Sequence, residues 1–495
     1  MRPRQQSRIS QRQQPSISRR QFFERAGAAS VAASLAASRC SGDSERAERP
    51  PNLLFLLTDD QRWDTLGIMG NNAIQTPNLD RLAREGVLFE NSFVTTSICP
   101  VSRASIFTGL YARCHGIHGF QTSLSEGLHA MSYPARFREA GYHTGFIGKY
   151  GVGGVNDLPR DRFDYFEGFG GQGSYLNETD GETVHLTKLM GLQALDFLDG
   201  CSPDQPFHLS VSFKAPHVQD GVEPYFIHDP AYDHVYAGVQ FEPFEKNDPR
   251  YFEELPEYLK NSENRVRWEQ RFATPEKWQE SMRRYHRLIY GIDVQVGNLL
   301  AFLDGRGWLD NTVILFNGDN GFYLGERGLA GKWYMHEESI RTPLLIRDPR
   351  RPATAGTRRA ETALNIDLCP TMLGLAGLAA PPAMNGRDLT PLLRGESPPW
   401  RSEWFYEHLF QHPRIPKSEG VRSGNWKYFR FFEQPEPNEF LYDLSVDSGE
   451  IHNLAQAGRQ PQLEPLRARK QAWVENLEAW KIDQAWREPE PGPAM

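Results

Sequence analysis

The chain has 495 residues, 39% of them hydrophobic and 24% charged, and carries a formal net charge of −8 at pH 7. This length exceeds that of one compact core of ordinary size, so we expect two domains, or one large domain with an appendage. The composition argues against a nucleic-acid partner and against a fold built on disulfides, and no apolar run reaches the roughly 20 residues of a transmembrane helix.

Residues 1–45 are predicted to be a twin-arginine export signal and linker. A polar, arginine-rich lead reaches Arg19 and Arg20, two phenylalanines follow, and a weakly apolar, alanine-rich run comes next. The alternative is a disordered basic tail. Cys40 is a candidate for lipid attachment, but Arg39 stands where such sites prefer a small residue, so we expect cleavage without a lipid. The predicted location is periplasmic or extracellular.

Two apolar runs after this segment stop abruptly on acidic residues. The first precedes Asp59 and Asp60, and the second, 312–316, precedes Asp319 and Asn320. Continuous apolar runs of this length are typical of strands buried on both faces of a parallel sheet. Such sheets bind ligands at the carboxyl ends of their strands, which is where both acidic pairs are expected.

Two shorter runs have the same form. Residues 143–148 lead to Lys149, and residues 207–213 lead to Lys214 and His217. Helical spacing of apolar residues appears between the runs, at 78–85 and 283–303. The predicted fold is therefore α/β, with a large, mostly parallel or mixed central sheet flanked by helices.

The predicted domains follow changes in composition. Residues 48–385 are expected to form the catalytic domain, in which the aromatic and acidic stretch 219–280 is an insertion that helps to wall the site. Proline-rich segments near 380–400 mark a boundary, and residues 386–495 are expected to form a smaller α+β subdomain that contributes to the substrate pocket. Its elements are short antiparallel strands near 420–422, 426–431 and 439–444, and a helix near 463–480.

Asp59, Asp60, Asp319 and Asn320 supply three carboxylates and a carboxamide, all of them hard oxygen ligands. At one sheet edge these carboxylates repel one another unless a divalent cation lies between them, and oxygen ligation favours calcium or magnesium. A single acidic pair is more often a helix cap or a turn. Two such pairs, each ending a similar strand, favour a metal site.

Cys99 begins a segment that leads through Arg103 into an apolar turn, as at a loop-to-helix junction. A helix N-terminus and a guanidinium both favour a bound oxyanion. The alternative is that Cys99 is a buried filler and Arg103 a surface charge. Further candidate cations around the oxyanion are Lys149, Lys214, His217 and Lys332, each of which, taken singly, is more often a surface or structural residue.

Taken together, the motifs resemble the type I sulfatase family of the alkaline phosphatase superfamily. They occur in the family's order and span nearly all of residues 51–454. The matching segments are Thr-Asp-Asp-Gln at 58–61, Cys-Pro-Val-Ser-Arg at 99–103, Gly-Lys-Tyr at 148–150, Lys-Ala-Pro-His at 214–217, Gly-Asp-Asn-Gly at 318–321, Gly-Lys at 331–332, Gly-Arg-Asp-Leu at 386–389 and Leu-Tyr-Asp-Leu at 441–444.

The resemblance implies that a formylglycine-generating enzyme oxidises Cys99 to formylglycine. One hydroxyl of the hydrated aldehyde then attacks sulfur and the alcohol leaves, and the second hydroxyl expels sulfate. By similarity, calcium is bound by the two acidic pairs and by the modified Cys99. Arg103 and Lys149 would hold the hydrated aldehyde, His217 would donate a proton to the leaving alcohol, and Lys332 would bind the sulfate oxygens.

The chain departs from the family at two positions. Val101 stands where the modification signature usually has proline or alanine, and Gly151 stands where the family often has a histidine. The Gly-Lys-Tyr form is similar to that of sulfatases that act on the 6-position of glucosamine. Candidate substrate contacts are Lys214, His115, His408 and His412, although an ordinary surface histidine is the alternative for the last three.

The predicted function is an exported sulfatase that hydrolyses the sulfate esters of carbohydrates. One alternative is a phosphodiester or phosphonate ester hydrolase, because that chemistry shares the metal and the fold. Another is a non-catalytic binder of sulfated glycan in which Cys99 remains a thiol.

Overall fold

The structure, a computed structural model, describes residues 49–179, 181–456 and 460–482. The chain divides into two units, Met1–Arg49 and Pro50–Met495. The predicted export signal at 1–45 and the candidate lipid site Cys40 lie outside the described residues. Within the described ranges, no helix combines the length and the hydropathy that a membrane span requires.

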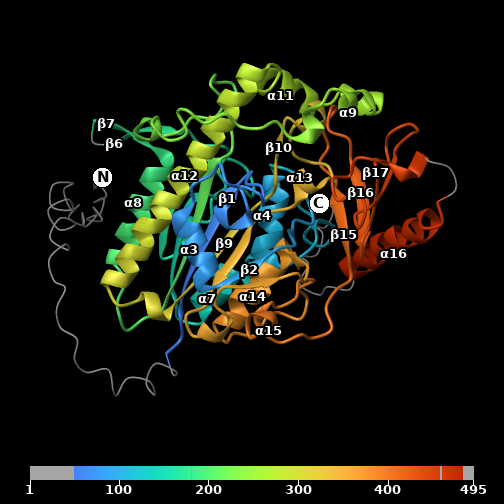
Figure 1. Cartoon of the computed structure of the whole chain (residues 1–495). Helices are drawn as coiled ribbons and strands as arrows, with labels where there is room; N and C mark the ends of the chain where they lie inside the picture. The colour runs from blue at the N-terminus through green and yellow to red at the C-terminus, as the bar shows by residue number, and fades with distance from the viewer. Residues whose placement is uncertain (1–48, 180, 457–459, 483–495) are drawn as a thin grey trace, which may run out of the picture. The chain divides into compact units, whose positions relative to one another are not determined.

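Eight strands form the central sheet, in the order β13-β2-β12-β9-β1-β8-β4-β5. Figure 1 labels β1, β2 and β9 of this sheet. β12 runs antiparallel to both of its neighbours, and the other neighbouring pairs are parallel. This mixed, mostly parallel sheet confirms the predicted fold class. The strands are β1 (Asn52–Asp59), β2 (Val87–Phe89), β4 (His143–Lys149), β5 (Tyr165–Phe169), β8 (Phe207–Pro216), β9 (Thr312–Gly318), β12 (Leu344–Arg347) and β13 (Thr357–Arg359).

β1 lies at the centre of the sheet and is apolar because both of its faces are covered. Leu53, Phe55 and Leu57 pack into one hydrophobic cluster, and Leu54 and Leu56 pack into another. Successive side chains of a strand point to opposite faces, so burial on both sides requires an unbroken apolar run. The sequence run thus directly reflects a strand between two layers of helices.

One layer of helices packs on each face of the sheet and contributes side chains to one of these two clusters. The layer that covers Leu54 contains α3 (Pro77–Glu85), α8 (Leu186–Asp199) and α12 (Pro275–Gly305). The layer that covers Phe55 contains α4 (Cys99–Thr108), α7 (Tyr133–Glu139) and α14 (Leu368–Leu375). α12 begins before the predicted helix 283–303 because the Thr274 side chain caps its first turn and Pro275 begins it.

Shorter elements fill the connections. The predicted insertion 219–280 contains α9, α10 and α11 as well as the start of α12. The bounds of the short elements are α5 (Ala112–His115), α6 (Glu126–Met131), α9 (Arg250–Glu253), α10 (Glu257–Lys260), α11 (Glu263–Arg271), α13 (Glu337–Ile340), α15 (Thr390–Leu393), β3 (Ser92–Phe93), β6 (Leu176–Thr179), β7 (Glu182–His185), β10 (Tyr323–Leu324), β11 (Ala330–Gly331) and β14 (Ala363–Leu364).

A second, antiparallel sheet has the order β15-β16-β17-β18 and packs against α16 (Leu463–Ile482). Three of its strands and the helix match the predicted elements. β15 was not predicted, because its residues are buried on both faces and show no polar alternation. The strands are β15 (Glu403–His408), β16 (Ser418–Ser423), β17 (Trp426–Arg430) and β18 (Glu439–Asp443).

A buried lysine joins this sheet to the segment that follows Lys332. Lys427 on β17 is fully buried and donates hydrogen bonds to Met335 O at 3.0 Å and to Glu337 Oε1 at 2.6 Å. It also forms an ion pair with the fully buried Glu450, at 2.6 Å. Because each partner is withdrawn from water, removal of the ammonium leaves buried carboxylates without their counter-charge.

We therefore expect Lys427→Met to lower the free energy of unfolding by about 3–5 kcal/mol, as measured by urea denaturation. Lys260→Met is the control, because Lys260 pairs at 3.5 Å with Glu257, whose side chain is 81% exposed. Exposed pairs contribute about 0–1 kcal/mol. Equal losses in the two variants would show that the buried ion pairs of Lys427 contribute no more to the free energy of unfolding than an exposed pair does.

Candidate active site

The acidic residues that end β1 and β9 meet at one edge of the sheet, as predicted. Leu57 lies opposite Asn317 in the parallel register, and Asp319 N donates to Thr58 O at 2.9 Å. Asp59 is the last residue of β1, and Asp60 follows with φ of 64°. Left-handed backbone is uncommon outside glycine, but aspartate adopts it more readily than most residues. The turn separates the two adjacent carboxylates.

The four predicted oxygen ligands of the metal are all buried, with at most 1% of each exposed. Asp60 N donates to Asp319 Oδ1 at 3.3 Å, and Asn320 Nδ2 donates to Asp60 Oδ1 at 2.5 Å. The carbonyl oxygen Oδ1 of Asn320 has no hydrogen-bond partner among the described residues. A buried acceptor without a donor is costly, and a cation would satisfy it.

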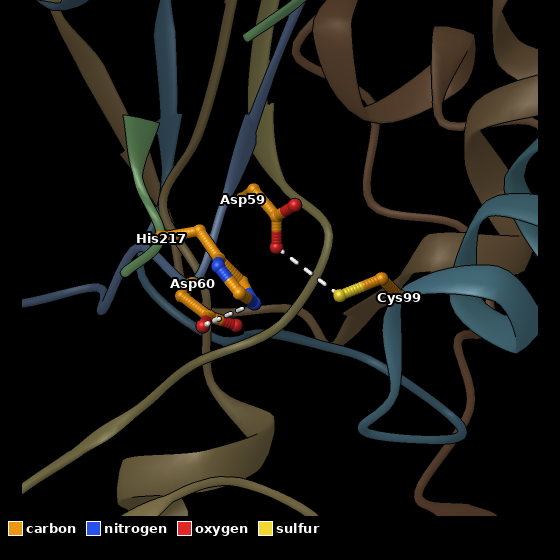
Figure 2. Close-up of side chains that lie close together, drawn as sticks. All are labelled: Asp59, Asp60, Cys99 and His217. Carbon is orange, nitrogen blue, oxygen red and sulfur yellow. Dashed lines mark hydrogen bonds and ion pairs between the residues drawn. The ribbon is translucent and has the colours of Figure 1, made fainter. Parts of the chain in front are cut away.

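Cys99 is the first residue of α4, which confirms the predicted loop-to-helix junction. Its Sγ lies 3.1 Å from Asp59 Oδ1 and 2.8 Å from Lys332 Nζ. Figure 2 shows the thiol pointing at the carboxylate of Asp59, with His217 and Asp60 beside it. Burial, together with the nearby negative charge of Asp59, raises the pKa of the Cys99 thiol. The unmodified side chain is therefore protonated at neutral pH and is a poor nucleophile.

Three buried cations surround these groups. Arg103 Nε donates to Asp319 Oδ2 at 2.8 Å, and its Nη1 donates to Lys149 O at 2.6 Å. Lys149 Nζ bonds to Asp59 Oδ2, and Lys332 Nζ bonds to Asp60 Oδ1. Burial alone lowers the pKa of Lys332, but the adjacent Asp60 and Asp59 carboxylates outweigh it and raise the pKa above its usual value.

His217 lies beside the carboxylates, with a ring nitrogen within 4.8 Å of the Cys99 Sγ. Its Nδ1 donates to Val218 O at 2.7 Å, and its Nε2 lies 3.5 Å from Asp60 Oδ2. Burial holds the pKa of His217 well below its usual range. With Nδ1 protonated, the neutral ring presents the lone pair of Nε2 to the site.

The residues fit a divalent cation. One ligand atom from each of Asp59, Asp60, Cys99 and His217 lies within 4.8 Å of the others. This cluster shares Asp59, Asp60 and Cys99 with the predicted ligand set and contains His217 in place of the Asp319–Asn320 pair. Burial above all, with a further effect of the Asp59 and Asp319 carboxylates, raises the pKa of Asp60 to about 6. A cation bound beside Asp60 would favour its charged form.

The charges at the site balance in the absence of a metal. Three carboxylates, those of Asp59, Asp60 and Asp319, face three cations, those of Arg103, Lys149 and Lys332. A divalent cation added to this neutral set leaves a net charge of two positive units in a buried place. Such a site attracts an anionic ester and stabilises further negative charge that develops on it.

The four predicted substrate contacts lie at different depths. Lys214 Nζ donates to Gly173 O at 2.9 Å and to Gln219 Oε1 at 2.6 Å, and burial lowers its pKa to about 7. His115 bonds to Ser105 Oγ and accepts from Ile117 N, both at 3.1 Å.

His408 ends β15, is fully buried, and has no hydrogen-bond partner on either ring nitrogen among the described residues. His412 lines the cavity beside Cys99. The structure therefore brings His412, but not the other three, to the wall of that cavity.

A cavity of about 230 Å³ opens beside Cys99. The predicted insertion contributes Asp220, Glu263 and Arg267 to its wall, which confirms that this stretch helps to enclose the site. The remaining lining residues are Phe120, Gln172, His217, Lys332, Trp333, Phe410, His412 and Ile415.

Most residues of this wall could not be predicted from the sequence, because they come from separate loops and form no motif. Trp333 was not predicted either, although its place directly after Lys332 could have indicated it. Its φ of 90° is unusual for a bulky residue, and such strain gathers at functional sites.

The two departures from the family pattern have local explanations. A Cβ at Gly151, where φ is 75°, would lie 2.6 Å from Cδ of Arg103. The path of the arginine side chain therefore excludes a larger residue at 151. Val101 is 1% exposed and packs in the cluster beneath the sheet, so the residue fits the folded helix.

Comparison with known proteins identifies two family models in the chain. The first, described as "Sulfatase", matches residues 51–378. The second, described as "N-sulphoglucosamine sulphohydrolase, C-terminal", matches residues 325–478. Together the two models extend from the first strand of the central sheet to the last helix.

The individual relatives have low sequence identity to this chain. The N-acetylglucosamine-6-O-sulfatase of Bacteroides thetaiotaomicron is 27% identical over 85% of this chain and 86% of its own length. A protein solved in complex with its substrate D-glucosamine-2-N,6-O-disulfate superposes with a TM-score of 0.73 at 24% identity, over 89% of this chain and 100% of that one. A phosphonate monoester hydrolase of Agrobacterium radiobacter gives a TM-score of 0.68 at 22% identity, over 87% and 95%. At this identity the solved structures share the fold alone.

Proposed function

Because the chain belongs to the sulfatase family, we propose that it is an exported hydrolase of sulfate esters carried by carbohydrate, active in the periplasm or outside the cell. One observation carries the proposal. Cys99 lies at the start of α4, within hydrogen-bond distance of both Asp59 and Lys332, and lines a cavity of about 230 Å³. This places an anionic group bound at Cys99 among three cations.

We further propose that a formylglycine-generating enzyme oxidises Cys99 during maturation. The resulting aldehyde, once hydrated, supplies an oxygen nucleophile that the protonated thiol lacks. Asp59, Asp60, Asp319 and Asn320, together with the modified side chain at 99, would hold calcium. Such an ion would supply positive charge for activating the nucleophile and neutralising the ester.

The side chains of this protein orient the ester and manage its charge. Arg103 and Lys149 both bond to the carboxylates that surround residue 99, which fixes their positions before substrate binds. Lys332 Nζ lies 2.8 Å from Cys99 Sγ and is therefore placed to bind an oxygen of a sulfate group attached there. Fixed donors of this kind need not reorganise when charge develops.

His217 is proposed to protonate the leaving alcohol. Val218 O holds its Nδ1 proton, so the ring delivers any second proton from Nε2, which faces the site. The negative charge of a bound sulfate ester opposes the effect of burial and favours that protonated form.

We expect His217→Ala to lower kcat for a sugar sulfate by about 10²–10⁴-fold. For 4-nitrophenyl sulfate, whose leaving group needs little protonation, the loss is expected to be much smaller. His143→Ala, at the partly exposed start of β4, is the control and should leave both rates unchanged. Equal losses on the two substrates would instead assign His217 to metal binding.

The carbohydrate part of the proposal is supported by the cavity wall. Phe120, Trp333 and Phe410 line it, and aromatic side chains provide flat apolar surfaces for the faces of a sugar ring. The relative from Bacteroides acts on N-acetylglucosamine 6-sulfate, as its name states. We propose a sulfated amino sugar as the first substrate to test.

The function is tested by sulfate release from a panel of sulfated mono- and oligosaccharides, with peptide mass spectrometry across Cys99. Turnover together with the mass change of thiol to aldehyde supports the proposal. Protein from its native host that keeps an intact Cys99, binds sulfated glycan and releases no sulfate would instead be a binding protein.

A second candidate is a phosphodiester or phosphonate ester hydrolase, which the superposition with the Agrobacterium enzyme favours. The neutral set of ions with an added divalent cation would also attract such esters. Kinetics of 4-nitrophenyl sulfate and of an aryl phosphonate monoester, measured side by side, decide between the two. We expect the larger kcat/KM for the sulfate.

A further inference from the structure

A second cavity, of about 180 Å³, lies beside the one that contains Cys99. His412 and Ile415 line both cavities, so the two are neighbours that share one wall. Each is smaller than the roughly 300–1,000 Å³ of a pocket for a drug-sized ligand. Each therefore suits a single sugar ring, and the pair suits two rings joined across the shared wall.

The shared wall is a tight turn that the insertion holds in place. His412 and Ile415 form an isolated antiparallel bridge, and Arg414 N donates to His412 Nδ1 at 3.2 Å. Glu263 N, at the start of α11, donates to Arg414 O at 2.9 Å, and Arg414 Nη2 donates to Glu263 Oε2 at 2.6 Å. The turn is thus fixed by these four contacts before any ligand arrives.

This arrangement also fixes the chemistry of His412. Because Nδ1 accepts a backbone proton, the neutral ring carries its own proton on Nε2. His412 is therefore a hydrogen-bond donor at the boundary between the cavities. Its ring stacks on that of Phe410, with centroids 6.0 Å apart and an angle of 21° between their planes. Donor and aromatic face together suit the oxygens and the apolar face of a sugar.

Two cationic side chains line the second cavity, and each keeps N–H donors that no neighbouring carboxylate binds. Arg414 lines it, is 52% exposed, and is bonded to Glu263 by one nitrogen of its guanidinium. Lys417 lines it as well and donates to Glu433 at 2.9 Å. A guanidinium has five N–H donors and an ammonium three, so both groups retain donors for a carboxylate or a sulfate.

We propose that this second cavity is a subsite for an anionic sugar linked to the sulfated sugar that is hydrolysed at Cys99. The proposal rests on the proposed function and deepens it: the substrate is an acidic oligosaccharide rather than a simple sulfated monosaccharide. Arg414 and Lys417 are assigned to the carboxylate or sulfate of the second sugar, and His412 to the region of the linkage.

The test compares kcat/KM for four substrates of the fully modified enzyme. They are the sulfated monosaccharide identified by the panel above, and disaccharides in which the same sugar is linked to a neutral hexose, a uronic acid or a sulfated hexose. We expect both acidic disaccharides to exceed the neutral one by about tenfold, the effect of one charge-assisted hydrogen bond. Comparison of the two acidic arms shows whether carboxylate or sulfate is preferred.

The variant Arg414→Ala is expected to reduce that preference to about one, mainly by raising KM for the acidic disaccharides. Lys417→Ala is expected to act in the same direction. Arg469→Ala is the matched control, because Arg469 is 55% exposed, pairs at 2.5 Å with Glu403 and lines neither cavity. It should preserve the preference for acidic disaccharides.

Equal kcat/KM for the neutral and acidic disaccharides in the wild-type enzyme would overturn the subsite, and so would a preference that survives both substitutions. In either case turnover of the sulfated monosaccharide leaves the proposed sulfatase function standing. Failure of every sulfated substrate, with turnover of the phosphonate ester, would instead reject the function on which the subsite rests.

Discussion

Replacing Cys99 with alanine is expected to lower the rate of sulfate ester hydrolysis by about 10⁴-fold or more, because the variant has no side chain from which a nucleophile can be made. The surrounding charges remain, so binding should persist. Cys99 is 1% exposed in a tightly packed helix, and alanine is smaller and suits a helix well. We therefore expect the variant to fold and to bind sulfated saccharide with little change in Kd, measured by calorimetry.

The control for this result is Cys201→Ala. Cys201 is also a buried free cysteine, but its Sγ donates to Phe197 O at 3.3 Å, at the end of α8 and away from the acidic cluster. We expect wild-type kcat/KM for this variant, with a modest loss of stability. A Cys99→Ala enzyme that retained most of its activity would show that no nucleophile derived from residue 99 takes part.

Replacing Asp60 with asparagine is expected to lower kcat/KM by about 10³-fold or more and to abolish the response to calcium. The Asp60 carboxylate belongs to both ligand sets and bonds to Lys332. Calcium at 100 times its Kd should stabilise the wild-type protein by about 2.7 kcal/mol, seen as a rise in Tm after dialysis against chelator. The variant, which lacks a shared carboxylate, should show little or no rise.

The metal-free proteins should also differ in their dependence on pH. The pKa of Asp60 is raised from 3.8 to about 6 in the folded state, because burial and the nearby carboxylates disfavour its charge. Folding therefore binds a proton between these values, and the penalty for the charged form disappears as pH falls through 6. In chelator, the wild-type protein should gain about 2 kcal/mol relative to Asp60→Asn between pH 7 and pH 4.

Asp348→Asn serves as the control for both measurements. Asp348 is also buried, but it pairs with Arg350 and Arg351 at a distance from the acidic cluster. This variant should keep the calcium response of the wild-type protein. If Asp60→Asn kept it as well, the acidic cluster would not be the calcium site.

The central sheet could be predicted because its strands are buried on both faces. The run before Asp59 and the run before Asp319 are unbroken, and parallel pairing brings the ends of such strands to one edge whatever lies between them. The same reasoning placed Lys149 and His217 at that edge, at the ends of β4 and β8. Local patterns thus determined which chemical groups would meet.

The distribution of contacts within the site could not be predicted. Asp319 bonds to Arg103, whereas His217 joins Asp59, Asp60 and Cys99 in the tightest cluster. Which of these side chains bond to one another depends on shifts of a few ångströms in their positions. The ends of the strands alone do not determine those positions. The same limit applies to His408, whose position at the end of β15 depends on a sheet built from residues far along the chain.

The close approach of Gly151 to Arg103 has an evolutionary consequence. A Cβ at residue 151 would lie 2.6 Å from the arginine side chain, and Arg103 in turn is bonded to Asp319 and to the backbone of Lys149. A histidine acquired at 151 therefore displaces a side chain that is bonded to both of these residues, so the first mutational step is expected to cost activity. Positions 151 and 103 should behave epistatically: a histidine at 151 becomes tolerable only after the backbone near Lys149 has moved.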